Sequence, residues 1–435
     1  AHLTLESWLN ELPPSMLRNR PGLLSIRGAI AYTKGDLQGG LNLLMQSEKI
    51  FREQGDTHGL IITLVRRGSA NRFLGDYEAS LHDAEEVIAL TESSDEWQML
   101  YADALRLKGL ALYRLGKADQ AVSYLERALD LCRVHDVANV PLLLLDTGMT
   151  YRAIGNFSEA LRVYEQALQI WRKEGNIYLQ ASLLNNLGVF HHSQGNYEKS
   201  ALAFEEGLLC VQRVRDERLT ALLSIGFGDL YAELEDFEMA DQNYQNAAEI
   251  LKKMDNRFLL HFLGISRATL ALLQFDSILA RNIIEEISDS ILSGNSNFEN
   301  GLLDLVYGRI YLMDGDVPQA VQMFLQAERR FDLEQRIAEK MTTHIWLAAA
   351  RHYTGESDSA LQNISGIVTS RRGIPHAALI AVHQAKNWLN GLQPIQTSGR
   401  GLRDLYTKAE KLGKIIPSIR RQLRRQVQAI STPTP

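Results

Sequence analysis

Apolar residues recur along the chain with the spacing of amphipathic helices, and short polar turn signals interrupt them at regular intervals. The commonest signal is a glycine followed by an acidic or amide residue, as in Gly75-Asp76, Gly155-Asn156 and Gly315-Asp316. Nine such turns follow one another at a spacing of 39 to 41 residues. Glycine after a helix favours the left-handed conformation that ends it, and Asp or Asn caps the next helix. The pattern therefore predicts nine helix–turn–helix units, with roughly 16 residues in each helix.

Three further columns of residues keep the same register. Seven residues before each turn the side chain is small: Gly28, Gly68, Gly109, Gly148, Gly188, Gly228, Ala268, Gly308 and Ala348. Five residues after each turn it is small again: Gly40, Ser80, Ala121, Ala160, Ser200, Ala240, Ala280, Ala320 and Ala360. Nine residues after the turn it is large, except for Ala84: Leu44, Leu125, Tyr164, Phe204, Tyr244, Ile284, Phe324 and Ile364. Antiparallel helices approach closely only where no bulky side chain separates their backbones, so these columns predict tightly packed hairpins.

The units resemble a known repeat family. "LNNLGVFHHSQGNYEKSALAFEEGL" and "LLDTGMTYRAIGNFSEALRVYEQAL" are similar to tetratricopeptide (TPR) repeats, lengthened to about 40 residues from the usual 34. The resemblance covers approximately residues 20–370 and departs in unit seven, where Phe275 replaces the turn glycine, and in unit nine, at His344 and Ala348. It implies an all-α fold, a right-handed superhelical solenoid of antiparallel helix hairpins with about nine repeats plus capping helices.

The two ends carry a second resemblance. "ESWLNELPPSMLRNRPGLLSIRGAIAYTKGDLQGGLNLL" is similar to the segment that opens the repeat domain of maltose-activator (MalT-like) bacterial regulators, which are STAND-type signal-transducing NTPases. The matching positions are Trp8-Leu9, Leu12-Pro13, Leu17, Pro21 and Leu23. The ending "IIPSIRRQLRRQVQAISTPTP" is similar to the junction that precedes an output domain in some of these regulators. The resemblance implies that the sequence is a central piece of a longer protein, with a P-loop module before it and an output domain after it.

The repeat register fails after unit nine, because Trp388 stands where the small column would continue. A repeat array needs a terminal element to cover its last apolar face, so we expect a cap there. The expected organisation is an N-terminal connector helix in residues 1–20, nine TPR-like repeats in 21–373, an irregular capping hairpin in 374–413, and a separate basic helix with a Pro/Thr tail in 414–435 that leads to the missing output domain.

Charge and composition narrow the possible partners. The net charge of −6 argues against nucleic-acid binding by the repeats. Between Arg400 and Arg425, however, nine Lys or Arg residues face two acidic residues, which indicates either a solvated helix face or a contact with phosphates or an acidic partner. Two cysteines, Cys132 and Cys210, lie far apart, and no apolar run approaches a membrane span. We therefore expect a cytoplasmic protein without a membrane partner.

No motif predicts catalysis. Gly116-Lys117 and Gly413-Lys414 lack the upstream glycine and the following Ser or Thr of a P-loop. His376 and His383 stand seven residues apart without a third metal ligand at a usable spacing, so a structural role is favoured for both. The sequence predicts no enzyme activity, no catalytic residues, no metal site and no cofactor.

A ligand site is expected on the first helices of the repeats. Stacked repeats form a superhelix whose concave wall is lined by these helices, and the TPR resemblance implies that positions three before, one after and four after the first small column face it. The polar candidates at these positions are Arg72, Arg106, Tyr113, Arg152, Asn185 and His192. His191 falls instead in a column that packs between helices. The alternative is that the candidates are solvated or pair with one another, as Arg106 could with Asp103.

These observations lead to a hypothesis about function. The chain is expected to be the ligand- or partner-sensing TPR domain of a larger bacterial transcription regulator, in which an inducer, either a small molecule or a protein, binds the groove and changes how the array holds its NTPase and output domains. One alternative is a scaffold that binds an acidic peptide along Arg72, Arg106 and Arg152. Another is self-association through the aliphatic groove of units six to eight.

Overall fold

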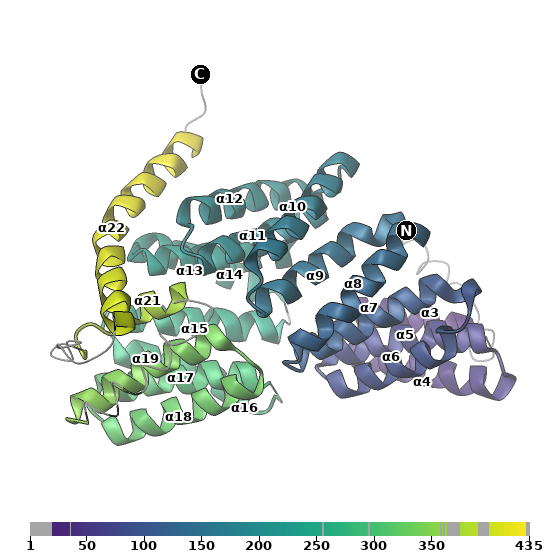
Figure 1. The fold of residues 1–435 in the computed structure, drawn as a ribbon, viewed down its shortest axis with the longest axis horizontal. Coiled ribbons are helices and arrows are strands. Elements are labelled where there is room, and N and C mark those ends of the chain that lie inside the picture. Colours follow the sequence, from purple (N-terminus) through teal and green to yellow (C-terminus); the bar gives the residue numbers. More distant parts are fainter. Residues whose placement is uncertain are drawn as a thin grey trace. The chain divides into compact units, whose positions relative to one another are not determined.

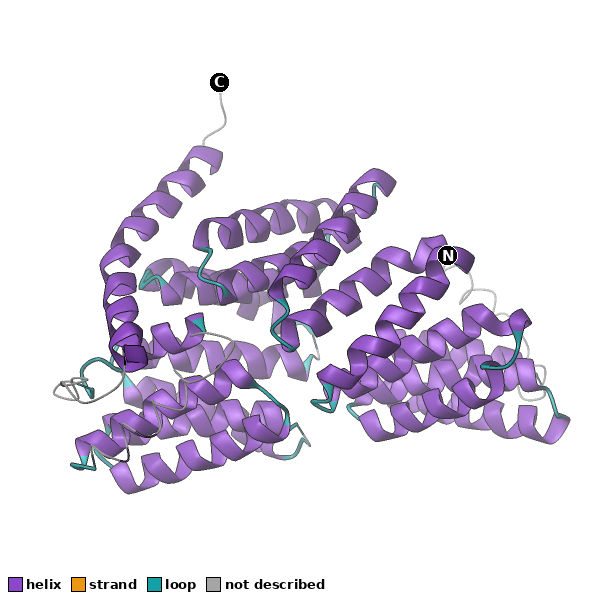
Figure 2. Cartoon of the chain, viewed as in Figure 1, coloured by secondary structure: helices purple, strands orange, loops and turns teal. Residues whose placement is uncertain are grey.

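The computed structural model describes residues 20–34, 36–254, 256–294, 296–356, 359, 362, 375–389 and 400–431, and in the last segment it describes the side chains of residues 403–425. Within these residues all regular structure is helical (Figure 2). The chain divides into two compact units, Ala1–Ala167 and Leu168–Pro435, and α10 (Phe157–Glu174) crosses their boundary.

Antiparallel helix pairs build both units (Figure 1). The N-terminal unit holds the pairs α3 (Pro21–Thr33) and α4 (Leu37–Gln54), α5 (Thr57–Leu74) and α6 (Tyr77–Thr91), α7 (Gln98–Arg114) and α8 (Ala118–His135), and then α9 (Val140–Ala153), which precedes α10. The C-terminal unit holds α11 (Ile177–Ser193) and α12 (Tyr197–Val214), α13 (Glu217–Glu233) and α14 (Phe237–Leu251), α15 (Arg257–Leu273) and α16 (Ser277–Leu292), α17 (Asn297–Met313) and α18 (Val317–Leu333), α19 (Ile337–Tyr353), α21 (His376–Gln384) and α22 (Arg400–Ser431).

The predicted all-α fold of TPR-like hairpins is confirmed. Eight helix pairs, from α3–α4 to α17–α18, match predicted repeats one to eight, and α19 is the first helix of repeat nine. The second helix of repeat nine and the predicted connector in residues 1–20 lie almost wholly outside the described residues. Within each unit the first helices of successive repeats lie side by side: α3, α5, α7 and α9 in one, and α11, α13, α15, α17 and α19 in the other. Each unit therefore has a continuous wall of first helices.

The turns adopt the backbone conformation that the glycine signal predicts. Gly75, Gly155 and Gly315, for example, have φ values of 86°, 77° and 84°. Glu235 and Phe275 replace the glycine in repeats six and seven and still hold φ values of 56° and 61°. A left-handed conformation costs a non-glycine residue about 1 kcal/mol or more, so other contacts must compensate at these two turns.

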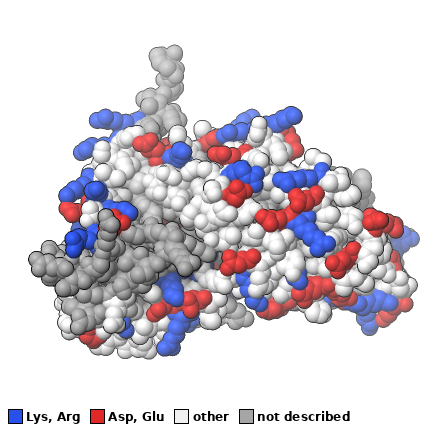
Figure 3. Space-filling model, in the orientation of Figure 1, with Lys and Arg blue, Asp and Glu red and all other residues white. Residues whose placement is uncertain are grey.

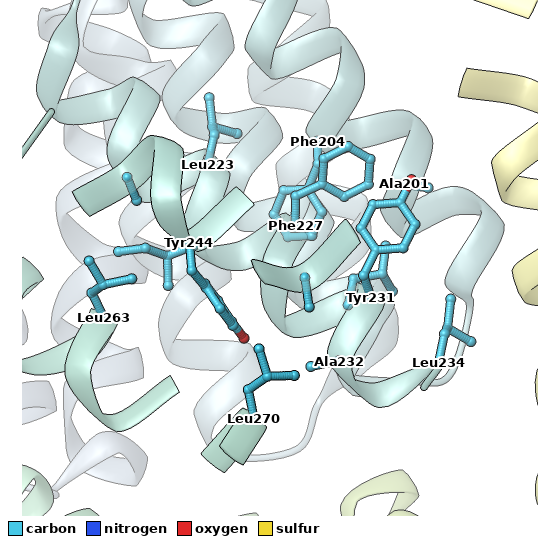
Figure 4. Close-up of a cluster of buried hydrophobic side chains, with 14 of the residues drawn as sticks. Ala201, Phe204, Leu223, Phe227, Tyr231, Ala232, Leu234, Tyr244, Leu263 and Leu270 are labelled. Atoms are coloured by element: carbon cyan, nitrogen blue, oxygen red, sulfur yellow. The ribbon is translucent and has the colours of Figure 1, made fainter. Parts of the chain in front are cut away.

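The first small column makes room for the large column of the following helix. A Cβ atom added to Gly188 would lie 2.5 Å from Cε1 of Phe204, and one added to Gly228 would lie 2.4 Å from Cε1 of Tyr244. In repeat two the large column holds the small residue Ala84, and a side chain from the next repeat packs over the glycine instead. A Cβ atom added to Gly68 would lie 2.4 Å from Cδ2 of Leu107 in repeat three. In the C-terminal unit these aromatic residues join a buried cluster that includes Phe227 and Tyr231 (Figure 4).

The C-terminal segment forms a cap, which consists of α21, the turn that follows it as far as Leu389, and α22. These helices pack on each other, and α21 also packs on α19. The prediction of a capping hairpin that ends at residue 413 and a separate basic helix in 414–435 is wrong at this boundary, because α22 runs unbroken from Arg400 to Ser431 with Pro417 inside it. The buried side chains of α22 explain why the helix continues: Leu405, Ala409, Leu412, Ile416 and Leu423 keep helical spacing across the proline. Their burial outweighs the hydrogen bond that Pro417 cannot donate.

Charged residues of both signs are spread over the visible face of the molecule, and basic side chains of α22 stand at its left edge (Figure 3). None of the described helices combines the length and the apolar character that crossing a membrane requires.

Candidate functional site

An arginine cluster lies on the wall of the N-terminal unit. Arg106 of α7 donates through Nε to Oδ2 of Asp146 on α9 at 2.6 Å. The hydrogen-bonding partner of Arg106 is thus Asp146 of the next repeat, and the pairing with Asp103 that the sequence allowed is not the one formed. Arg72 of α5 is partly buried, and its Nε atom is fully buried without a hydrogen-bond partner. Burial, together with the neighbouring Arg106 guanidinium, lowers the pKa of Arg72.

Two further predicted residues belong to the same neighbourhood. Arg152 of α9 and Tyr113 of α7 are both partly buried, and both interact with the buried side chain of Tyr164 on α10. Burial raises the pKa of Tyr164, against the effect of the Arg152 charge. Asp146 also acts on Tyr164 electrostatically. Asp146 thus acts on Arg72 and Arg106, while Tyr113 and Arg152 act on Tyr164. That these four residues bind a ligand stays a prediction.

The same wall carries two residues that extend the cluster toward the first repeat. Arg66 of α5 donates to Oγ of Ser25 on α3 at 2.9 Å. Tyr32 of α3 has its pKa raised by burial, and the charges of Arg66 and Arg72 oppose that rise. The arginine cluster, which we define as Arg66, Arg72, Arg106 and Arg152, has Asp103 and Asp146 as neighbouring carboxylates, and both act on Arg106. Such a wall favours an anionic ligand.

The remaining predicted residues, Asn185 and His192, belong to α11 of the C-terminal unit. Asn185 is 7% exposed, and its Oδ1 atom has no hydrogen-bond partner. His192 forms an ion pair with Glu233 of α13, with 3.0 Å between Nε2 and Oε2. Burial lowers the pKa of His192, but the Glu233 carboxylate outweighs burial and raises it. His192 is therefore held in place by a neighbouring helix.

Glu233 is also the centre of contacts that the sequence did not reveal. Its Oε1 atom accepts a hydrogen bond from Tyr197 Oη at 2.8 Å and another from Nε2 of His376, a cap residue on α21, at 2.8 Å. His192, which is near Asp229 as well, approaches the other oxygen, Oε2. Burial would raise the pKa of Glu233, but His192 and His376 hold that pKa well below its usual range.

The turn of repeat six binds the cap through three further contacts. His383 of α21 donates to Oε1 of Glu235 at 2.9 Å, and this bond lowers the pKa of Glu235. Arg420 of α22 donates to the backbone carbonyl of Glu235 at 2.7 Å. Arg424 of α22 donates through Nε to Oδ2 of Asp236 at 2.6 Å. The histidines at 376 and 383 thus bind glutamates of the repeats, and part of the basic segment binds an acidic surface of its own chain.

Repeat seven contributes an aromatic contact to the cap. The ring of Phe275, in the second turn that lacks glycine, stacks on the Trp388 indole with 6.1 Å between ring centres. Trp388 also meets Trp346 of α19 edge to face at 5.7 Å. Both turns in which glycine is replaced therefore use the replacing side chain to hold the cap. These contacts compensate for the left-handed backbone at Glu235 and Phe275.

His191 points to a different environment from its neighbour, as predicted. It is 9% exposed, and burial lowers its pKa. With Leu168 and Arg172 of α10 and Leu184, Leu187, Lys199, Leu202, Ala203 and Glu206 it lines an open cavity of about 220 Å³. Among the described residues, no three His, Cys, Asp or Glu side chains are arranged to hold a metal ion.

The sequence analysis did not identify Asp146, Glu233 or the contacts of the cap. Asp146 left a signal, because a carboxylate inside the apolar segment "VPLLLLDTGM" requires a partner once it is buried. No sequence pattern indicates the contacts of Glu233, because it stands 143 residues before His376 and outside the columns that define the repeat.

Comparisons with known proteins agree with the fold. Residues 65–133, 100–173 and 179–253 match models of the tetratricopeptide repeat, so the chain contains these repeats. No curated protein sequence matches the chain. A Rap protein complexed with competence and sporulation factor has a similar structure, with a TM-score of 0.62 at 12% identity over 85% of this chain and 99% of that one.

Two ligand-free structures are also similar. The quorum sensor NprR from B. thuringiensis has a TM-score of 0.54 at 14% identity and matches 77% of this chain and 97% of its own. RapI has a TM-score of 0.52 at 14% identity, over 62% and 98% of the two chains. At these identities the likeness extends to the helical-repeat fold, which is typical of protein-interaction and sensing domains.

Proposed function

We propose that this array of tetratricopeptide repeats senses a ligand that bears carboxylate or phosphate groups and binds it at the arginine cluster. The observation that carries the proposal is Arg72. Its guanidinium is partly buried, its Nε atom has no hydrogen-bond partner, and the nearby Arg106 charge repels it. A buried donor without a partner costs about 1–3 kcal/mol, which an anionic ligand would recover by accepting its hydrogen bond.

The comparisons support a sensing role. One similar structure is a Rap protein complexed with competence and sporulation factor, and another is a quorum sensor. An extended peptide with acidic side chains would suit a row of arginines carried by successive repeats, because each repeat offers one contact along its length. We therefore propose an acidic peptide as the ligand.

A binding experiment tests this proposal. Fluorescent hexapeptide pools of acidic, neutral and basic composition would be titrated into the full chain, and binding would be followed by anisotropy. We expect the acidic pool to bind best. Arg72→Ala should weaken its binding about tenfold, since a hydrogen bond to a charged group is worth about 1.5–3 kcal/mol. Arg72 lies over the Phe73 ring at 4.7 Å, so circular dichroism and the thermal midpoint of Arg72→Ala should be measured alongside binding to separate lost binding from lost packing.

The matched control is Arg133→Ala. Arg133 of α8 is exposed and pairs with Asp130 of the same helix at 2.9 Å, away from the wall. Its substitution should leave peptide binding unchanged. Equal binding of the three pools, or an equal loss in both variants, would contradict the proposal.

We further propose that the array belongs to a bacterial STAND-type transcription regulator, as the resemblance of its N-terminal segment implies. Ligand binding would then favour one arrangement of the array and thereby alter its hold on neighbouring NTPase and output domains. The flanking gene sequence tests this context. A P-loop module upstream and an output domain downstream would support it, and a gene that encodes neither would refute it.

A further inference from the structure

Glu233 touches the wall of first helices and the cap at the same time. Its Oε2 atom lies 3.0 Å from Nε2 of His192, a wall residue. Its Oε1 atom accepts from His376 of the cap at 2.8 Å and from Tyr197 at 2.8 Å. His192 therefore pairs with Oε2 by charge, while Tyr197 and His376 share Oε1 and lie 3.0 Å apart between Oη and Nε2.

The docking of the cap on repeat six is a specific fit. The turn Asp of most repeats caps the following helix, as Asp276 does by accepting from Leu279 N and Asp316 from Gln319 N. Asp236 makes no such capping bond and is used by Arg424 instead. Glu235 accepts a left-handed backbone where glycine would be unstrained. Repeat six thus lacks both the capping bond and the turn glycine that most other repeats have, and the residues at these two positions contact the cap instead.

The imidazole of His376 is also fitted to the turn of repeat five. A Cβ atom added to Gly195 would lie 2.7 Å from Nδ1 of His376, so the ring rests directly on the backbone of the turn. The His376 side chain is 11% exposed and the Glu233 side chain 17%. A nearly dry contact of this kind depends on the orientation of the carboxylate, because little water is present to replace a lost partner.

We propose that His192 is a positioning residue that couples the wall of the C-terminal unit to the docking of the cap. It holds Oε2 of Glu233, and this aims Oε1 at His376. A ligand group that draws His192 away frees the Glu233 carboxylate, weakens the bond to His376 and releases α21 and α22 from repeats five and six. The cap thus has two states, docked and released, and a ligand on the wall of the C-terminal unit favours the released state. This regulation rests on the proposed sensing function in that the chain is a sensor, but it requires a ligand group at His192 of the C-terminal unit rather than at the arginine cluster.

Amide hydrogen exchange of the full chain tests the coupling without any ligand. His192 pairs with Glu233 of α13, and His192→Ala should accelerate exchange in α21 about tenfold, in line with the loss of one partner of a buried carboxylate. Asn185→Ala is the matched control, because Asn185 lies on the same wall two turns earlier and makes no bond to Glu233. It should leave α21 unchanged.

A double-mutant cycle separates coupling from general destabilisation. If His192 acts through Glu233 on His376, adding His192→Ala to His376→Ala should cause no further acceleration in α21. Exchange in α17 and α18, which lie in the same unit, should stay constant throughout. The proposal is overturned if α21 is unaffected by His192→Ala, if the two substitutions act additively, or if α17 and α18 accelerate equally. Because no ligand is present, a failure here leaves the peptide-binding experiment intact, and the reverse also holds.

Discussion

Asp146 is the residue on which the arginine cluster depends. Its side chain is 9% exposed and forms an ion pair with Arg106. Its charge also acts on Arg72, where it opposes the lowering of the pKa. A repeat wall with several arginines would repel itself without such a group. Asp146 therefore offsets part of the positive charge of the cluster at Arg106 and Arg72.

Asp146→Asn should lower the free energy of unfolding of the N-terminal unit by about 3 kcal/mol, because it leaves a partly buried arginine without its carboxylate. Urea denaturation followed by circular dichroism measures this loss. Asp130→Asn is the control, since the Asp130–Arg133 pair is exposed on both sides and such pairs contribute about 0–1 kcal/mol. Equal effects of the two substitutions would show that Asp146 has no special role.

The small column gives a second prediction at this scale. Gly228→Ala gains about 1 kcal/mol in helix propensity but places a methyl group against the Tyr244 ring, and overpacking of this kind costs about 1–3 kcal/mol. The ring cannot move aside easily, because Tyr244 Oη donates to Oδ1 of Asp229 at 2.7 Å. We expect a lower thermal midpoint. Gly22→Ala, where no atom lies within 4 Å of the new Cβ, should not lower it.

At the scale of elements, the periodic pattern located the helix pairs well and failed in the cap. Turns such as Gly155-Asn156 carry their own signal, since glycine alone ends one helix and the next residue begins another. Pro417 carries an equally strong local signal for a helix start, and yet α22 passes through it. The deciding interactions are the burial of Leu412 and Ile416 against residues far away in the sequence, which no local pattern records.

Pro417→Ala should therefore stabilise α22. A proline inside a helix is about 3 kcal/mol less favourable than alanine, and α22 retains its apolar stripe in either case. Slower amide exchange in residues 412–423 would be the expected result. Ile415→Ala, at an exposed position of the same helix, should leave that exchange unchanged. Faster exchange in Pro417→Ala would mean that the proline is needed for the path of α22.

At the scale of the whole molecule, the cap contacts depend on pH in two directions. Glu233 and Glu235 have lowered pKa values, so their contribution is present above the unfolded value of about 4.3 and is lost as the pH falls through the folded values. His192 has a raised pKa, so its contribution is complete below about 6.5 and is lost as the pH rises through the folded value.

The docking of the cap should accordingly be strongest between about pH 4.5 and 6.5 and weaker at pH 8.5. Protection factors of α21 and α22, corrected for intrinsic exchange, would measure this at pH 5.5, 7.0 and 8.5. The side chains that contact Glu233 are His192, His376 and Tyr197, and Asp229 lies near His192. His192→Ala should make the decline between pH 7.0 and 8.5 less steep, and an unchanged slope would contradict this assignment.

For the candidate site, as for the fold, positions set by the repeat could be predicted and contacts with the cap could not. The positions of Arg72, Arg106, Tyr113 and Arg152 on the first helices of their repeats could be predicted, because each stands at a fixed distance from a column that the repeat defines. Their role in binding stays a prediction. The partners of His192 could not be predicted in the same way. Glu233 is paired with His376 across 143 residues, and Asp236 with Arg424 across 188. Contacts of that range join a periodic region to an aperiodic one, so no period can indicate them.

The cap meets the turns of repeats five, six and seven and the first helix of repeat nine at once. An open solenoid can gain or lose a unit freely, because each repeat contacts only its neighbours. In the C-terminal unit, one extra repeat between Phe275 and Trp346 would separate the two surfaces that Trp388 joins, and one fewer would make them collide. The cap contacts are therefore compatible with only one number of repeats between these surfaces. Duplication of a repeat in this part of the chain would break them.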